Sequence, residues 1–217
     1  MLMETRYEDG GSMTDRQLLD EANILMVAGH ETSAMALSWA WYLLASNPNV
    51  ASKLLSASQE NLEGKDPSFE QLRNMGYSLQ VIEEVMRLYP PAWITDREPL
   101  EDEVFEEIPI KKGLDIICLI YSLHRNPKYW SNPEEFDPER FNTENKKLQV
   151  PYSYIPFGGG PRLCIGNNFA LMEMQFVLSM LIQRYQFELV SKEPVALNPL
   201  VTLRPENGIK MRIKKRS

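Results

Sequence analysis

Cys164 lies in the glycine-rich segment Phe157-Gly-Gly-Gly-Pro-Arg-Leu-Cys-Ile-Gly166, which leads into a predicted helix. Backbone N–H groups and the positive end of the helix dipole favour the thiolate form of a cysteine at this position. Thiolates bind metals, and glycines let the backbone approach a flat or bulky group. On these residues alone an alternative stays open, in which Cys164 is a small buried hydrophobe and the glycines form a simple turn.

No second cysteine or histidine completes a zinc site with Cys164. Cys118, His30 and His124 do not provide the paired ligand spacing that zinc requires. We therefore predict no zinc, and we interpret Cys118 as an inert residue of an apolar strand.

Glu31 and Thr32 form a second candidate site, inside a long predicted helix. A threonine hydroxyl can bond to the carbonyl four residues earlier or leave it free, and beside Gly29 this could open the helix to water or O₂. Such an opening would allow the pair to relay protons. The alternative is structural: Glu31 satisfies a neighbour and Thr32 bends the helix.

The cysteine segment matches the pattern F-x-x-G-x-R-x-C-x-G and resembles the haem-binding signature of the cytochrome P-450 superfamily, the haem-thiolate monooxygenases. All fixed positions are filled, by Phe157, Gly160, Arg162, Cys164 and Gly166. The resemblance runs from about residue 14 to the C-terminus. It implies haem b as cofactor, with Cys164 as the axial ligand of the haem iron. It also implies that the acid and alcohol Glu31 and Thr32 deliver protons to bound O₂.

Two further motifs are similar to those of this family. Glu84-Val-Met-Arg87 places Glu84 and Arg87 on one helical face. Pro138-Glu-Arg-Phe141 follows about fifty residues later, and the resemblance implies that Arg140 joins the pair in a buried charge network behind the haem. A second copy of the first motif, Glu70-Gln-Leu-Arg73, is interpreted as a solvated helix face.

The resemblance also implies the partners of the reaction. Arg162 and Arg97 would bind the haem propionates. A small hydrophobic substrate would contact residues 24–29, 92–95 and 198–201. Electrons would come from a separate protein (a ferredoxin, a flavodoxin-like protein or a reductase), because the sequence contains no dinucleotide, flavin or iron–sulfur motif.

The elements that position these residues are predicted to be mostly helical, in the α+β class. A long central helix is predicted over residues 15–47, with apolar residues on nearly all sides. It begins after a capping-box sequence at Thr14 and ends before Pro48. The remaining helices are predicted over residues 49–63, 69–75, 77–88 and 167–185. Short strands are predicted near residue 94 and over residues 104–108, 116–121, 187–190, 201–203 and 210–213. The resemblance makes this the C-terminal half of the cytochrome P-450 fold, with the haem-binding cysteine loop before a long helix.

Composition is that of a globular protein, with 217 residues, 43% hydrophobic and 24% charged. The net charge of −7 argues against nucleic acid as a partner. The longest nearly apolar run, residues 34–45, is too short to cross a bilayer, and two cysteines are too few for a disulfide framework. We therefore expect a cytoplasmic location, with an anchor on a longer parent chain left open.

On this resemblance, residues 1–217 form a single partial domain, from the central helix to the C-terminus, without the N-terminal half of the fold. Two functions remain open on this basis. The chain is part of an active monooxygenase, which a missing N-terminal half would complete. Alternatively it is a non-catalytic remnant, or one half of a split enzyme that does not bind haem alone.

Overall fold

A long helix runs along the molecule, and its C-terminal part packs against the other long helices. The computed structural model describes residues 2–191 and 193–216. Helix α1 (Asp15–Ser46) has Thr14 as its N-cap. The Thr14 hydroxyl accepts the N–H of Gln17 at 3.3 Å, and the Gln17 side chain accepts the N–H of Thr14 at 2.9 Å. This reciprocal pair is the predicted capping box, which satisfies two N–H groups that the helix itself leaves free.

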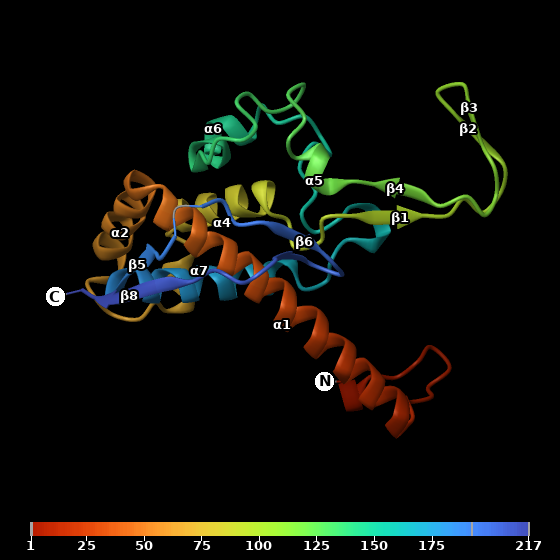
Figure 1. The fold of residues 1–217 in the computed structure, drawn as a ribbon. Coiled ribbons are helices and arrows are strands. Elements are labelled where there is room, and N and C mark those ends of the chain that lie inside the picture. Colours follow the sequence, from red (N-terminus) through yellow and green to blue (C-terminus); the bar gives the residue numbers. More distant parts are fainter. Residues whose placement is uncertain (1, 192, 217) are drawn as a thin grey trace.

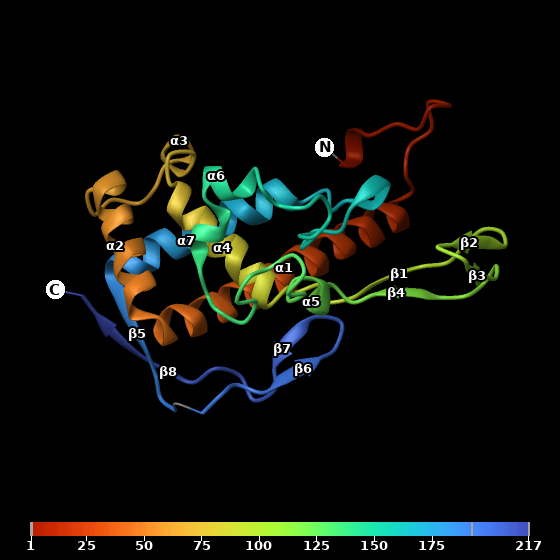
Figure 2. The same ribbon diagram turned by 90° about the horizontal axis from the view of Figure 1, so that it is seen from above.

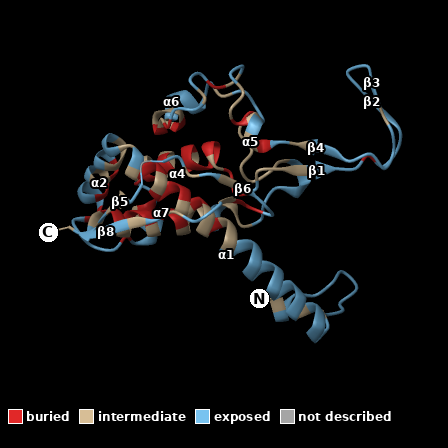
Figure 3. Ribbon diagram, viewed as in Figure 1, coloured by how far each residue is buried: buried red, intermediate tan, exposed pale blue. Residues whose placement is uncertain are grey.

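Three helices pack against the C-terminal part of α1 and enclose the core (Figures 1 and 3). They are α2 (Pro48–Leu62), α4 (Gly76–Leu88) and α7 (Asn167–Arg184). The described part also has short helices α3 (Phe69–Leu72), α5 (Ile120–Leu123) and α6 (Thr143–Lys146), and 3₁₀ turns η1 (Leu2–Glu4), η2 (Pro138–Phe141) and η3 (Gly160–Arg162). The core includes Trp39, Leu54, Val81, Val85 and Leu178, each at most 1% exposed. The prediction of a mostly helical α+β fold is confirmed.

The expected burial of α1 along its whole length is wrong. Buried residues begin only at Ser33, and the N-terminal half projects away from the core (Figure 3). Its apolar side chains are 50–73% exposed, namely Leu19, Ile24, Leu25, Met26 and Val27. The apolar pattern was recognised correctly, but among the described residues no element covers this half of the helix. A large apolar surface therefore remains open.

The strands form two-stranded antiparallel pairs in the described part of the chain. The pairs are β1 (Thr95–Arg97) with β4 (Ile116–Cys118), β2 (Glu103–Phe105) with β3 (Ile108–Ile110), β5 (Tyr185–Leu189) with β8 (Met211–Lys215), and β6 (Leu197–Pro199) with β7 (Leu203–Pro205). The β2–β3 hairpin lies at the far end of the β1–β4 ribbon, away from the helices (Figures 1 and 2). The β6–β7 hairpin instead lies against α1, through a hydrogen bond from Trp39 to Leu203.

Several predicted boundaries are corrected by the structure. Residues 104–108 are not one strand. They span the end of β2, a turn at Glu106 and Glu107 with φ values of 46° and 71°, and the start of β3. Neither residue is a glycine or asparagine, so the sequence carried no turn signal there. The strand predicted over residues 116–121 ends at Cys118, and the helix predicted over residues 69–75 ends at Leu72. Strand β6 was not predicted.

None of the helices in the described ranges is both long enough and apolar enough to cross a membrane.

The burial pattern predicts where stability resides. Leu178 of α7 is 0% exposed in the core, whereas Leu148 is 81% exposed. We expect Leu178→Ala to lower the free energy of unfolding by about 2–5 kcal/mol, because it removes apolar contacts and leaves a cavity. The matched change Leu148→Ala should alter it by less than about 0.5 kcal/mol. Urea denaturation of both variants measures the difference, and equal effects would contradict the assigned core.

Candidate functional site

The Cys164 loop is a closed turn that presents the cysteine to solvent. The N–H of Cys164 donates to the carbonyl of Phe157 at 3.0 Å. Gly158 and Gly160 adopt φ values of +75° and +70°, a backbone region that favours glycine. A Cβ on Gly159 would lie 3.2 Å from Cε1 of Tyr152, so this glycine also permits close packing. Local geometry therefore explains why glycines occupy this segment.

Cys164 itself is exposed, which excludes the alternative of a small buried hydrophobe. Phe157 at the start of the loop packs against the main core, while the residues around the thiol face outward. In Figures 1 and 2 the loop before α7, drawn in teal, lies at the same end of the molecule as the exposed half of α1. The surface beside the thiol is apolar, with Leu163, Ile165 and Phe169 at 50%, 95% and 65% exposure.

These residues fit the chemistry that binding of haem requires. The macrocycle is flat and largely apolar, its iron takes a thiolate ligand, and its two propionates are anionic. Cys164 supplies an accessible sulfur, and the exposed side chains of Leu163 and Ile165 supply an apolar surface. The cationic side chains of Arg162 and Arg97 are also exposed. Arg97 donates to the hydroxyl of Thr95 at 3.1 Å and to the carbonyl of Asp96 at 2.6 Å. The propionate roles of both arginines stay predictions.

Glu31 and Thr32 lie at the boundary between the exposed and buried halves of α1. The Thr32 hydroxyl donates to the carbonyl of Ala28 at 2.7 Å, and α1 is continuous through this point. Glu31 is not bonded to Thr32. Its carboxylate accepts hydrogen bonds from Thr202 and Arg204, which sequence reasoning missed. Those residues are more than 170 positions away in the chain, and no local pattern indicates them.

Glu84 and Arg87 form a fully buried ion pair. Arg87 Nε donates to Glu84 Oε2 at 2.6 Å and Nη2 donates to Oε1 at 2.8 Å, with both side chains 0% exposed. Arg140 Nε lies 3.3 Å from Glu84 Oε1. The structure thus brings together the three residues that the motifs singled out. Burial raises the pKa of the Glu84 carboxyl, whereas the Arg87 bonds and the Asp137 N–H lower it.

The remaining donors of Arg87 bind a segment of the chain that has little regular structure. Nη1 donates to the carbonyls of His124 and Pro133 at 2.9 and 2.7 Å, and Nη2 donates to the carbonyl of Glu135 at 2.9 Å. The N–H of Asp137 donates to Glu84 at 2.9 Å. The ion pair therefore positions residues 124–137, a role that the motif spacing alone did not indicate.

His124 links this network to the cysteine loop. Its Nε2 accepts the N–H of Ile155 at 2.9 Å, two residues before Phe157. His124 is 0% exposed. Burial lowers the pKa of His124 to about 3, and the nearby Arg87 charge acts in the same direction. The ring is therefore neutral near pH 7, as its acceptor role requires.

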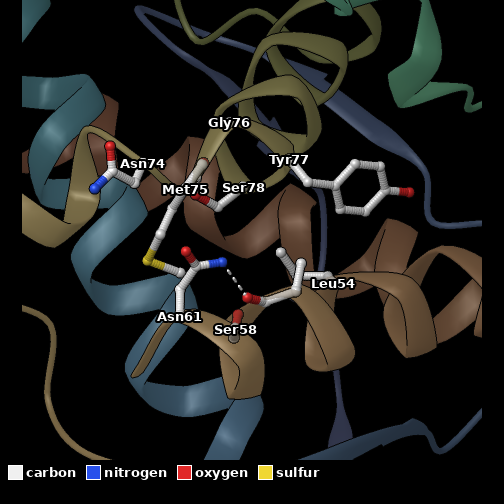
Figure 4. A pocket seen from close by; sticks show the side chains of 9 residues that line it. Leu54, Ser58, Asn61, Asn74, Met75, Gly76, Tyr77 and Ser78 are labelled. Atoms are coloured by element: carbon white, nitrogen blue, oxygen red, sulfur yellow. Dashed lines mark hydrogen bonds between the residues drawn. The ribbon is translucent and has the colours of Figure 1, made fainter. Parts of the chain in front are cut away.

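Two hollows of the described surface lie away from these residues. One, of about 210 Å³, lies between α2 and α4 and is lined by Ser58, Asn61 and Asn74 among others (Figure 4). The other, of about 560 Å³, lies between α2, β5 and the end of α1, with Trp41 and Phe187 in its wall. Neither is lined by Cys164, Glu31 or Thr32.

The family model and the similar proteins that follow were found by comparison with known proteins. Residues 1–212 match the family model described as cytochrome P450. The chain is 34% identical over 212 residues to Protein LUTEIN DEFICIENT 5, chloroplastic, of Arabidopsis thaliana, covering 96% of this chain and 36% of that protein. It is 35% identical over 206 residues to Putative cytochrome P450 132 of Mycobacterium tuberculosis, covering 93% of this chain and 43% of that protein. It is 36% identical over 221 residues to Cytochrome P450 4V2 of Homo sapiens, covering 100% of this chain and 42% of that protein. The chain thus spans 36–43% of the length of these relatives.

The buried ion pair generates a prediction with an internal control. We expect Glu84→Ala to lower the free energy of unfolding by roughly 3–5 kcal/mol, because it leaves the Arg87 charge buried without its partner. Glu70 has the same i,i+3 arginine but is exposed, so Glu70→Ala should change stability by less than about 0.5 kcal/mol. Urea denaturation compares the two, and similar losses would contradict the structural role of Glu84.

The low pKa of His124 predicts a pH dependence. Between about pH 6.5 and 3 the unfolded chain binds a proton at this histidine that the folded chain does not. The free energy of unfolding should therefore fall on acidification, with this residue contributing about 1.4 kcal/mol per pH unit between roughly pH 6 and 4. Urea denaturation at several pH values should show a shallower dependence for His124→Gln, whose amide oxygen can still accept the Ile155 N–H. Equal slopes in the two proteins would contradict a neutral His124.

Proposed function

The chain belongs to the cytochrome P450 family, and from this premise we propose that it is the haem-binding part of a haem-thiolate monooxygenase, with Cys164 as the ligand of the haem iron. Proteins of this family bind haem, iron protoporphyrin IX, as cofactor. The observation that carries the proposal is the exposed thiol of Cys164, in a complete signature loop beside apolar side chains.

When bound, the haem supplies the activation of O₂ and the transfer of one oxygen atom to a substrate. The residues of this chain prepare that chemistry. The closed turn from Phe157 to Cys164 holds the sulfur in place, and His124 fixes the approach to this turn through Ile155. Arg162 and Arg97 would hold the propionates by charge-assisted hydrogen bonds. Glu31 and Thr32 would pass protons to the oxygen.

The substrate is proposed to be a small hydrophobic molecule. Of the three segments expected to contact it, residues 24–27 are at least 50% exposed and apolar. The other two segments meet in the structure, since Trp93 Nε1 donates to the carbonyl of Leu200 at 2.8 Å. Electrons are proposed to come from a separate ferredoxin, flavodoxin-like protein or reductase.

A second candidate function is supported by the open half of α1. Its exposed apolar residues show that the described chain does not cover the whole surface of its central helix. In this candidate the chain is a non-catalytic remnant, or a partner in a split enzyme that binds haem only after assembly. The two candidates differ in whether the chain alone binds haem.

Absorption spectroscopy tests the proposal. The chain is produced with a supply of haem, reduced and exposed to carbon monoxide, together with Cys164→Ala and the control Cys118→Ala. We expect a strongly red-shifted Soret band for the unchanged chain and for Cys118→Ala, and none for Cys164→Ala, because only a thiolate ligand gives this shift. Folded protein without haem would contradict haem binding by this chain alone and favour the second candidate.

A further inference from the structure

We propose that Thr202 and Arg204 are positioning residues for Glu31: they hold its Oε1 atom and leave Oε2 as the oxygen that exchanges a proton. This inference rests on the proposed function, in which Glu31 belongs to the proton-delivering pair. It assigns roles to two residues of the β6–β7 hairpin, and neither residue belongs to any of the motifs.

Every hydrogen bond that Glu31 receives through its side chain ends on the same oxygen. Thr202 Oγ1 donates to Oε1 at 2.5 Å, and Arg204 donates to it from Nη2 at 2.5 Å and from Nε at 3.2 Å. Within the described part of the chain, no residue donates to Oε2. The Glu31 side chain is 27% exposed. Water can therefore reach the carboxylate while Oε1 remains held, and Oε2 is the oxygen left to accept a proton.

The charges around Glu31 favour its ionised form. The hydrogen bond from Thr202 and then the bond from Arg204 lower the pKa of the Glu31 carboxyl below its usual value. Desolvation acts in the opposite direction, and the Arg204 charge adds to the lowering. A carboxylate near neutral pH is a proton acceptor. In the relay, a hydronium ion of the solvent would protonate Glu31 and become water, and Glu31 would then pass this proton on and return to the carboxylate, rather than hold a proton at rest.

The hairpin that carries Thr202 and Arg204 is attached to the core by contacts that do not involve Glu31. Trp39 Nε1 donates to the carbonyl of Leu203 at 2.9 Å, and the N–H of Leu203 donates to the carbonyl of Pro91 at 3.0 Å. Thr202 and Leu203 are 4% and 2% exposed. Because the backbone between the two positioning residues is fixed in this way, their side chains can be changed without releasing the hairpin.

The geometry also explains why residue 204 is an arginine. Its guanidinium presents two nitrogens to one oxygen, and Nε lies 3.3 Å from the Thr202 hydroxyl as well. A lysine could supply the charge but only one point of contact. We therefore expect Arg204→Lys to keep most of the contribution of residue 204 to the lowered pKa of Glu31, and a neutral side chain of similar length to lose that contribution.

The test measures the pKa of Glu31 directly in the 217-residue chain, without haem. NMR of the chain labelled with ¹³C at the glutamate carboxyl carbons gives this value, with Glu31→Gln to assign the signal. We expect Thr202→Val and Arg204→Met each to raise the pKa of Glu31 towards its usual value. Arg204→Lys should restore most of the shift. The control Arg212→Met, an exposed arginine of β8, should leave the value unchanged.

An unchanged pKa of Glu31 in both Arg204→Met and Thr202→Val would overturn the inference. Thermal unfolding of each variant checks that the hairpin stays in place, and the conservative change Thr202→Ser supplies a second folded variant in which the pKa should stay low. The outcome is independent of the carbon monoxide spectrum. A chain that binds no haem but shows these pKa shifts would favour the second candidate function and keep the positioning roles. A chain that binds haem but shows none of these pKa shifts would support the proposed function and overturn the positioning roles.

Discussion

The buried ion pair of Glu84 and Arg87 is the interaction on which the arrangement of the site depends. A guanidinium with no exposed surface must have its donors satisfied, and three of its bonds go to carbonyls of residues 124–135. This segment belongs to a long stretch, from residue 124 to α7, that contains no extended sheet and only single helical turns. The Arg87 guanidinium on α4 thus positions this segment, as the hydrogen bonds of a sheet would in other folds. His124 continues the connection to Ile155 and so to the Cys164 loop.

Part of the molecular surface is apolar and exposed because the core does not include it. The core is formed by α2, α4, α7 and the C-terminal part of α1, and it is complete without the N-terminal half of α1. The exposed apolar residues of that half, of the Cys164 loop and of the turn after β6 therefore contribute little to folding. Surfaces of this kind in globular proteins are sites of binding. The Cys164 loop and the exposed half of α1 lie at the same end of the molecule (Figures 1 and 2), so this end is open both to the proposed cofactor and substrate and to a partner chain.

Sequence patterns correctly predicted the structural features that depend on interactions between residues close together in the chain. The capping box at Thr14 and the stop at Pro48 defined α1, and the i,i+3 spacing placed Glu84 beside Arg87. The identical spacing of Glu70 and Arg73 shows the limit of spacing as a signal. The family resemblance singled out Glu84 and Arg87, and the physical difference between the two pairs is their burial. The hairpin at Glu106 and the pairing of Glu31 with Arg204 were missed for two different reasons. The first uses an unusual backbone conformation without its usual residues, and the second joins positions far apart in the chain.

Glu84 and Glu31 show how similar pairs of charges are given different uses. Both are carboxylates on helices, and both accept two hydrogen bonds from one arginine. Glu84 is fully buried and both of its oxygens are occupied, so a proton has neither a path nor a free oxygen. Glu31 is partly exposed and is held through one oxygen only, which leaves the other accessible to water. Burial and the number of occupied oxygens, rather than the presence of an arginine, therefore separate a carboxylate that supports the fold from one suited to proton transfer.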